Sequence, residues 1–298
     1  MDEEQSRQRE NARARFEASL NQHGYSFQYS VLQTAWNFER TNNSSFVFEV
    51  AEFPVEVQKA GTRIDFILRR SKPNILINNS ERPLYLIAEC KRVNPALADW
   101  CFVRAPFTKR DPRVNTLLID SIQIHDRAEG PFVISRRCPL ERDDFFQIGI
   151  DTRTGKQGDA EGHGRGAIED AATQVLRGLN GFIQFLDEKF LLISDTNGCE
   201  LLPVIFTTAN LWVSSVDLSK ADLTTGNVLI PPDKFSKVGW LLFQYNQSPG
   251  IKHNIIQLSE IGGIGDLLES VYVRTIPIIN PSGIEEFFKW ASSLDLFP

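Results

Sequence analysis

The chain has 298 residues, of which 42% are hydrophobic and 23% charged, and its formal net charge is −6. It is long enough to bury a substantial core, and its acidic balance excludes a protein that coats nucleic acid by bulk electrostatics. No stretch reaches the apolar length that a membrane crossing needs, and the charged start is unlike a secretory signal. We therefore expect a cytoplasmic, globular protein with no membrane partner.

The first part of the chain is predicted to be helical. Within Glu3–His23 most positions are charged or polar, and small or apolar residues recur at a helical spacing: Ala12, Phe16 and Leu20. Gly24 then stands where helices commonly end. A second helix is expected near Tyr29–Phe38.

Three strands are predicted next, because the period of the apolar residues changes from that of a helix to that of a strand. Ser45–Gln58 is rich in Val and Phe with charges at alternate places, Thr62–Arg70 has a similar pattern, and Leu84–Val93 is largely apolar. Their short connections predict an antiparallel meander.

The pattern weakens over residues 94–150, where we predict several short elements, among them a strand at Phe146–Ile150. The glycine-rich stretch Asp151–Gly166 lacks the G-x-x-x-x-G-K-[ST] pattern of a phosphate loop. It is expected to be either a flap over a binding cleft or an ordinary surface loop. Ala167–Leu186 is the clearest helix, because its apolar residues fall on one stripe.

The remaining chain is predicted to add strands and a last helix. The strands are expected at Leu201–Phe206, Val238–Tyr245 and Arg274–Ile279. Ser282 and Glu285 have the spacing of a capping box, which predicts the start of a terminal helix. Together the elements predict an α/β sandwich around one mixed sheet, built as a single domain over residues 1–298.

One group of charged residues interrupts these apolar strands. Glu89 and Lys91 lie two residues apart and therefore share a face of their strand, and Asp65 lies in the middle of the preceding strand. If the two strands pair, Asp65 comes to lie beside Glu89. Two neighbouring carboxylates repel each other unless a cation lies between them.

A hard divalent ion, Mg²⁺ or Mn²⁺, would relieve this repulsion, and the carbonyl oxygen of Cys90 could serve as a further ligand. Such an ion polarises a phosphorus centre and lowers the pKa of a bound water. Lys91 would stabilise the charge that develops on the phosphate or help to orient the attacking water. These residue types therefore predict metal-assisted phosphodiester hydrolysis.

Asp65 in G-T-R-I-D-F-I-L, followed by Glu89 and Lys91 in L-Y-L-I-A-E-C-K, resembles the PD-(D/E)xK nuclease superfamily. The resemblance covers about Phe16–Phe206. It implies the restriction-endonuclease-like fold, an α/β/α sandwich around a central mixed sheet. In that fold residues 10–93 and 167–210 would form the core, 94–166 a large insertion after the third core strand, and 211–298 a C-terminal extension.

The resemblance also implies further site residues. A helix before the sheet often supplies an acidic residue, here Glu17 with Glu10 as second choice, and the first strand often supplies a glutamate, here Glu56 as a metal ligand with Glu52 behind it. Gln174 corresponds to a residue of the helix after the third strand. The chain departs from the family pattern in the length of the segment that separates this helix from the third strand, which puts the match of Gln174 in doubt.

The function implied is that of a magnesium-dependent endonuclease. DNA is the expected substrate rather than RNA, and the family's habits suggest a homodimer and an effector recruited by partner proteins, such as those of an antiviral defence system. Four basic residues near aromatic ones could contact the nucleic acid or belong to a solvated loop: Arg104, Lys109, Arg110 and Arg113. Two alternatives remain. The protein could be a catalytically inactive relative that binds nucleic acid or a partner as a scaffold, or the acidic pair could be an ordinary ion-paired sheet face.

Overall fold

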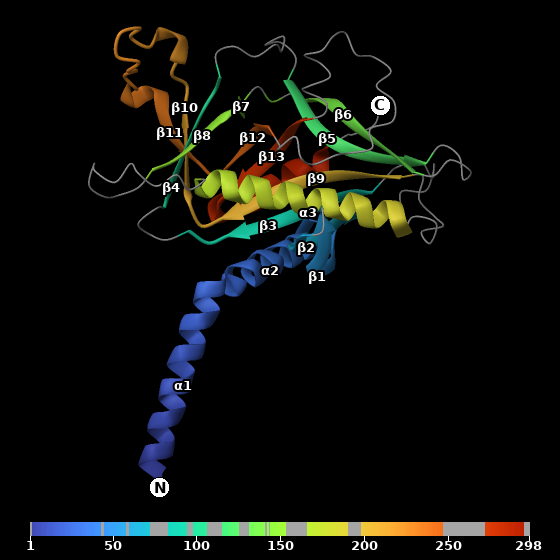
Figure 1. Ribbon diagram of the computed structural model, residues 1–298, viewed down its shortest axis with the longest axis vertical. Helices are drawn as coiled ribbons and strands as arrows, with labels where there is room; N and C mark the ends of the chain where they lie inside the picture. The colour runs from blue at the N-terminus through green and yellow to red at the C-terminus, as the bar shows by residue number, and fades with distance from the viewer. Residues whose placement is uncertain are drawn as a thin grey trace.

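The structure is a computed structural model, and one central sheet carries most of its described strands (Figure 1). The described residues are 2–42, 45–57, 60–71, 83–93, 98–105, 115–124, 131–140, 142, 144–152, 166–189, 198–246 and 272–294.

Within these residues the central sheet has nine strands and is mixed. In chain order they are β1 (Ser45–Val57), β2 (Ala60–Ser71), β3 (Leu84–Lys91), β5 (Asn115–Ile124), β6 (Pro131–Leu140), β7 (Phe145–Phe146), β9 (Gly198–Thr207), β12 (Trp240–Asn246) and β13 (Val273–Ile279). Across the sheet the order is β1-β2-β3-β9-β13-β12-β7, and β5 pairs with both β6 and β9. The expected mixed α/β architecture is therefore present.

The predicted meander is confirmed, because β1, β2 and β3 pair antiparallel in that order. Strand β3 then runs parallel to β9, from Leu84 opposite Glu200 to Lys91 opposite Thr207. Parallel strands end at the same edge of a sheet. The carboxyl ends of β3 and β9 therefore lie together, and this edge carries the residues described below.

Helices cover both faces of this sheet. On one face, α3 (Ala167–Lys189) packs on β1, β2 and β3 through a buried apolar cluster that includes Leu179, Val55 and Ile87. On the other face, α2 (Tyr25–Asn42) and α5 (Ile284–Ser293) pack through a second cluster, in which Phe38 and Phe288 meet with ring centroids 5.7 Å apart. The period-2 alternation of the strands separates the two clusters.

A second, four-stranded sheet has the order β11-β10-β4-β8. Its strands are β4 (Asp99–Val103), β8 (Ile148–Thr152), β10 (Asn210–Ser214) and β11 (Phe235–Val238). The chain between β10 and β11 contains two short 3-10 helices, η3 (Leu218–Lys220) and η4 (Pro232–Lys234), and stands out from the body in Figure 1. Strands β4 and β8 of this sheet, with β5–β7 of the central sheet, belong to the expected insertion, whereas β10 and β11 follow it in the chain.

Helix α1 (Asp2–His23) extends away from the rest of the molecule (Figure 1). It is separated from α2 by Gly24, whose φ of +76° lies in the left-handed region that glycine adopts without strain. The side chains of residues 4–19 are all exposed. No helix of the described part of the chain is long and apolar enough to cross a membrane.

Two expectations about the C-terminal part differ from the structure. Residues 211–298, expected as an extension, contribute β12 and β13 to the central sheet, where β13 pairs with β9. The predicted capping box is wrong. A 3-10 turn, η5 (Pro281–Gly283), precedes α5, so the Asn280 side chain caps that turn by accepting from the Ser282 amide at 3.0 Å.

Candidate functional site

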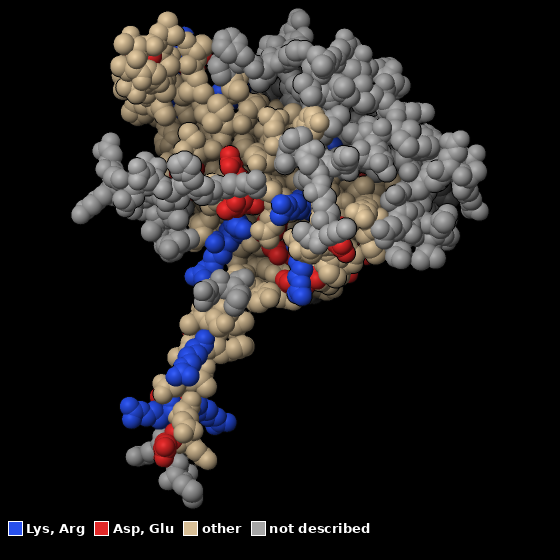
Figure 2. All heavy atoms as spheres, viewed as in Figure 1, with Lys and Arg blue, Asp and Glu red and all other residues tan. Residues whose placement is uncertain are grey.

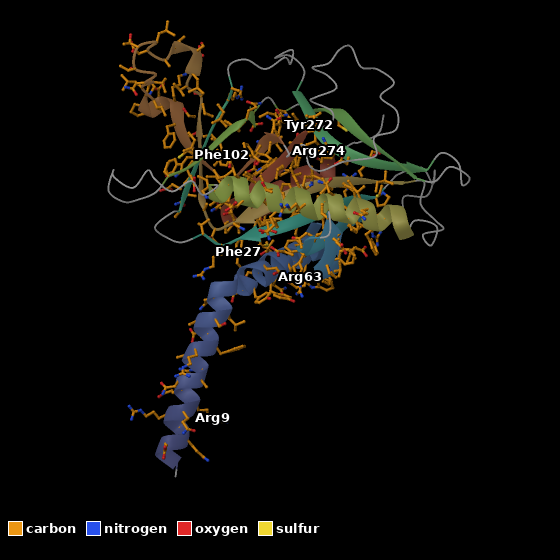
Figure 3. All side chains as sticks on the ribbon, in the orientation of Figure 1. Arg9, Phe27, Arg63, Phe102, Tyr272 and Arg274 are labelled. Carbon is orange, nitrogen blue, oxygen red and sulfur yellow. The ribbon has the colours of Figure 1, made fainter. Side chains whose placement is uncertain are left out.

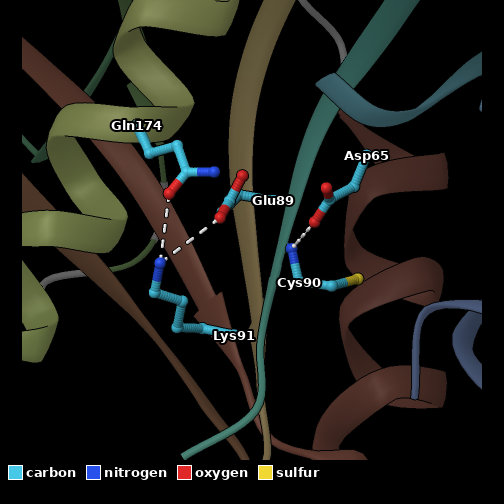
Figure 4. A network of polar contacts seen from close by, with 5 residues as sticks. All are labelled: Asp65, Glu89, Cys90, Lys91 and Gln174. Atoms are coloured by element: carbon cyan, nitrogen blue, oxygen red, sulfur yellow. Dashed lines mark hydrogen bonds and ion pairs between the residues drawn. The ribbon is translucent and has the colours of Figure 1, made fainter. Parts of the chain in front are cut away.

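Strands β2 and β3 separate where the acidic residues lie. Their pairing runs from Arg70 opposite Leu84 to Phe66 opposite Ala88, and extending it by one residue places Asp65 opposite Glu89. At this point the Cys90 amide donates a hydrogen bond to Asp65 Oδ2 at 2.6 Å instead of to a backbone carbonyl of β2 (Figure 4). A side-chain carboxylate therefore takes the place of a backbone acceptor where the pairing of β2 with β3 ends.

The main chain of Asp65 is also held in place. Gln28 of α2 is buried, and its Nε2 donates to the Asp65 carbonyl oxygen at 2.7 Å. A helix on one face of the sheet thus fixes the backbone from which the carboxylate projects.

Glu89 and Lys91 project toward α3, as expected from their shared face (Figure 4). Glu89 is only 3% exposed. The Lys91 ammonium lies 3.6 Å from Glu89 Oε1 and donates a hydrogen bond to Gln174 Oε1 of α3 at 3.1 Å. Gln174, inferred from resemblance alone, is therefore in direct contact with Lys91.

The end of β3 is tied to the turn after β9 by two hydrogen bonds, and a third stabilises that turn. The Thr208 amide donates to the Lys91 carbonyl at 3.2 Å, and the Val93 amide donates to the Thr208 hydroxyl at 3.0 Å. Thr207 turns its hydroxyl back to accept from the Ala209 amide at 3.1 Å. These bonds leave Lys91 on a rigid strand end while its side chain stays 29% exposed.

A third carboxylate, Glu52 of β1, acts on the same group. Its backbone has a φ of +52°, an uncommon value for a residue other than glycine. The register of β1 against β2 skips it, passing from Ala51 opposite Phe66 to Phe53 opposite Ile64. Its charge raises the pKa of both Asp65 and Glu89, although one of its oxygens also lies 3.6 Å from the exposed Arg63 guanidinium.

The acidic side chains have strongly perturbed protonation equilibria. Burial, opposed by the hydrogen bond from Cys90, raises the pKa of Asp65 from 3.8 to about 6. Burial and then the charge of Asp65 raise the pKa of Glu89 well above 4.5, although Lys91 opposes both. Lys91 thus acts on both Asp65 and Glu89, while Glu52 has the exposed Arg63 beside it, so the two buried carboxylates together are short of positive charge.

The chemistry of this group fits a hard divalent cation. Carboxylate and carbonyl oxygens are the ligands that such ions prefer, and Mg²⁺ commonly keeps several waters while binding one or two carboxylates. The N–H and C=O of one strand residue point to the same side, so the Cys90 carbonyl faces the side from which Asp65 approaches. Asp65, Glu89 and this carbonyl would hold the ion. Among the described residues no three His, Cys, Asp or Glu side chains form a group that could hold a metal.

The other expected site residues lie elsewhere. Glu17 is exposed on α1, the helix that extends away from the sheet, as is the second choice, Glu10. Glu56 is exposed near the end of β1, opposite Gly61. The structure therefore does not bring Glu17 or Glu56 to Asp65 and Glu89, and on β1 it brings Glu52 instead.

The expected nucleic-acid contacts are described only in part. Arg104 is exposed at the end of β4, with its guanidinium 5.9 Å from the centre of the Phe146 ring. It lines a cavity of about 220 Å³ between the two sheets together with Asp144 and Trp240. Lys109, Arg110 and Arg113 lie outside the described residues.

Two residues of this site were missed or ranked low from the sequence. Gln28 is the polar residue on the otherwise apolar inner face of α2, which contains Val31 and Phe38, and that interruption was the available signal. Glu52 and Glu56 have the same parity on one strand, so alternation alone cannot choose between them.

Comparison with known proteins gives no match for this chain, either among family models, among curated proteins or among solved structures.

Proposed function

We propose that the chain is a metal-dependent nuclease of restriction-endonuclease-like fold that hydrolyses phosphodiester bonds. The observation that carries this proposal is the meeting of Asp65, Glu89 and Lys91 where β2 leaves β3, with Lys91 also bonded to Gln174. A sheet edge at which parallel strands end together, between helices on both faces, supports the same fold.

Asp65 and Glu89 would hold a magnesium or manganese ion, which when bound supplies a Lewis acid and lowers the pKa of a coordinated water. Lys91 donates to a non-bridging phosphate oxygen as negative charge develops there. Gln174 accepts from Lys91 and so directs the ammonium, and the Cys90 amide keeps Asp65 Oδ2 in one orientation.

DNA is the proposed substrate, and recruitment by partner proteins of a defence system is the proposed context. Both the substrate and the context are proposed because the pattern of Asp65, Glu89 and Lys91 resembles that of the PD-(D/E)xK nuclease superfamily. Arg104, exposed at the end of β4, is the described residue best able to contact a backbone phosphate.

The test is cleavage of plasmid, single-stranded DNA and RNA with Mg²⁺, with Mn²⁺ and with EDTA. Cleavage of DNA that stops in EDTA is expected. Lys91→Ala is expected to lower the cleavage rate by about 100-fold or more, since it removes a charged donor to the transition state. Lys220→Ala is the matched control, because this lysine is 80% exposed on η3 and its ammonium lies 3.9 Å from Asp217, remote in sequence from the acidic pair.

Three outcomes contradict the proposal or part of it. Binding of nucleic acid without cleavage in any metal would favour an inactive scaffold. Equal activity of Lys91→Ala and Lys220→Ala would place catalysis elsewhere. Cleavage of RNA alone would agree with metal-dependent phosphodiester hydrolysis but would contradict DNA as the substrate.

A further inference from the structure

Helices α1 and α2 each carry a stripe of residues with the same spacing, and six of the eight are exposed; Leu20 and Leu32 are half-buried, Leu32 against the second apolar cluster. On α1 the stripe is Arg9, Arg13, Phe16 and Leu20, and on α2 it is Tyr25, Tyr29, Leu32 and Trp36. In both, successive residues are four, three and four positions apart, which is the spacing of one seam along a helix.

The aromatic members of these stripes are unusually exposed. Phe16 is 65% exposed, Tyr29 56%, Trp36 53% and Tyr25 39%. The buried face of α2 is a different one, formed by Gln28, Val31, Ala35 and Phe38. Helix α2 therefore has an apolar outer stripe in addition to the one that packs on the sheet.

The two stripes cannot cover each other within one chain. The bend at Gly24 directs α1 away from the body, and Figure 3 shows Arg9 pointing into solvent from a helix with nothing beside it. Figure 2 likewise shows the arginine side chains of α1 standing clear of the body. A polar helix of this length is marginal in water without a packing partner.

We propose that this arm, α1 with α2, pairs antiparallel with the arm of a second copy of the chain, each α1 stripe lying on the α2 stripe of the other copy. The spacing of four, three and four residues is the same in both directions along a helix. Two antiparallel helices that carry it can therefore be aligned so that each stripe residue of one helix lies opposite a stripe residue of the other. Phe16 then faces Tyr29 of the partner subunit, Leu20 faces Tyr25 of the partner subunit, and Arg9 faces Trp36 of the partner subunit.

The chemistry of these pairs favours a second copy over other occupants. Arginine is attracted to the face of an aromatic ring, above all that of tryptophan, and this register places Arg9 against the ring of Trp36 of the partner subunit. Arg13 lies opposite Leu32 of the partner subunit. By twofold symmetry each contact occurs twice. The aromatic side chains of the two copies would together bury on the order of 800 Å², and with the neighbouring residues the contact exceeds the roughly 1,000 Å² of a specific interface.

The first experiment measures the mass of the full-length protein by sedimentation equilibrium after nuclease treatment and in high salt. A dimer is expected. Phe16→Glu is expected to raise the dissociation constant at least tenfold, because it places a carboxylate against a buried ring. Leu223→Glu is the matched control, since Leu223 is fully exposed in the chain between η3 and η4.

A monomeric wild-type protein, or a dimer lost on nuclease treatment, would overturn the proposal, the latter because nucleic acid would then be the occupant. So would an equal effect of Phe16→Glu and Leu223→Glu. Near-ultraviolet circular dichroism checks that each variant is folded, which the exposure of Phe16 leads us to expect.

The second experiment tests the register. Phe16→Glu and Tyr29→Lys should each weaken the homodimer. Mixed together, they should form a heterodimer that has one Glu–Lys pair and one native Phe–Tyr pair, with a dissociation constant at least tenfold lower than that of either homodimer. Failure of the mixture to associate more tightly would reject the pairing. Both experiments are independent of nuclease activity.

Discussion

At the scale of single residues, the site is controlled by carboxylates that the protein does not fully neutralise. Asp65 is fixed by two hydrogen bonds, one to its side chain from the Cys90 amide and one to its carbonyl from Gln28. Glu89 is buried beside a single ammonium. Holding like charges close together in a buried site destabilises the folded state, unless bound protons or a cation offset the repulsion.

This leads to a prediction about pH. The pKa of Asp65 is about 6 in the folded protein against 3.8 ordinarily, so the folded state binds the proton more tightly than the unfolded state. The stabilisation is fully present below pH 4 and is lost as the pH rises through 6, an effect of about 3 kcal/mol. Without divalent ions, the free energy of unfolding of the wild type should therefore fall, relative to that of Asp65→Asn, between pH 4 and pH 7.5. Urea titrations at both pH values measure this, and a constant difference would contradict it.

A second prediction at this scale concerns metal ions. Adding Mg²⁺ at pH 7.5 should raise the melting temperature of the wild type, because an ion that binds only the folded state stabilises it by mass action. The increase should be absent or much smaller in Asp65→Asn. Since this measurement needs no substrate, it separates metal binding from nuclease activity. An equal increase in both proteins would place the ion elsewhere.

At the scale of elements, the close packing of α3 on the sheet positions Gln174 over Lys91. Two glycines allow this approach. A Cβ added to Gly181 would lie 2.5 Å from Val55 Cβ of β1, and one added to Gly178 would lie 3.0 Å from Ile64 Cγ1 of β2. Each glycine weakens the helix by about 1 kcal/mol relative to alanine. The close approach of the strands beneath α3 explains why glycine occupies these two positions.

We therefore predict that Gly181→Ala destabilises the protein although alanine favours helices. Overpacking of this kind costs about 1–3 kcal/mol, and a branched Cβ held on a strand cannot move away. Val55→Gly should relieve the clash because it removes the Cβ as well as the two methyl groups, so the double variant should lose less stability than the two single variants combined. Gly178→Ala is the matched comparison and should cost less, because the atom it meets can rotate. Denaturant midpoints decide the order, and an additive double variant would contradict the argument.

At the scale of the whole molecule, the two ends of the described chain contribute very differently. Helix α1 has exposed side chains and meets the body near Arg92, which bonds the Asn21 carbonyl. Helix α5 buries Phe287 and Phe288, and Arg70 of β2 donates to the Ala291 carbonyl at 2.9 Å and to the Leu294 carbonyl at 2.7 Å, which secures the helix end.

Removing residues 1–23 should therefore leave a folded protein, whose melting temperature matches that of the full chain at concentrations below the dissociation constant of the proposed dimer. Removing residues 281–298 should prevent folding, because one apolar cluster would be opened to water. Amide dispersion in proton–nitrogen NMR spectra distinguishes the two outcomes. A well-dispersed spectrum of the C-terminal truncation would contradict this view of α5.

The sequence predicts the parts of this molecule whose contacts are local. Alternation located β1, β2 and β3, and it placed Glu89 and Lys91 on one face. It missed β5 and β6, although these two strands pair with each other across residues 125–130. It also missed the pairing of β9 with β3, β5 and β13, because those partners are distant in the chain and no local pattern encodes them. It could not separate Glu52 from Glu56 either, since the choice depends on the irregular register of β1 and on the positive φ of Glu52.

The position of β13 in the central sheet has a consequence for synthesis. Its neighbour β9 leaves the ribosome about seventy residues earlier, which at roughly 5–20 residues per second is a delay of several seconds. During that interval an apolar strand lacks part of its hydrogen-bonded edge and the nascent polypeptide is open to pairing with other chains. Expression should therefore depend on chaperones and improve when translation is run at low temperature.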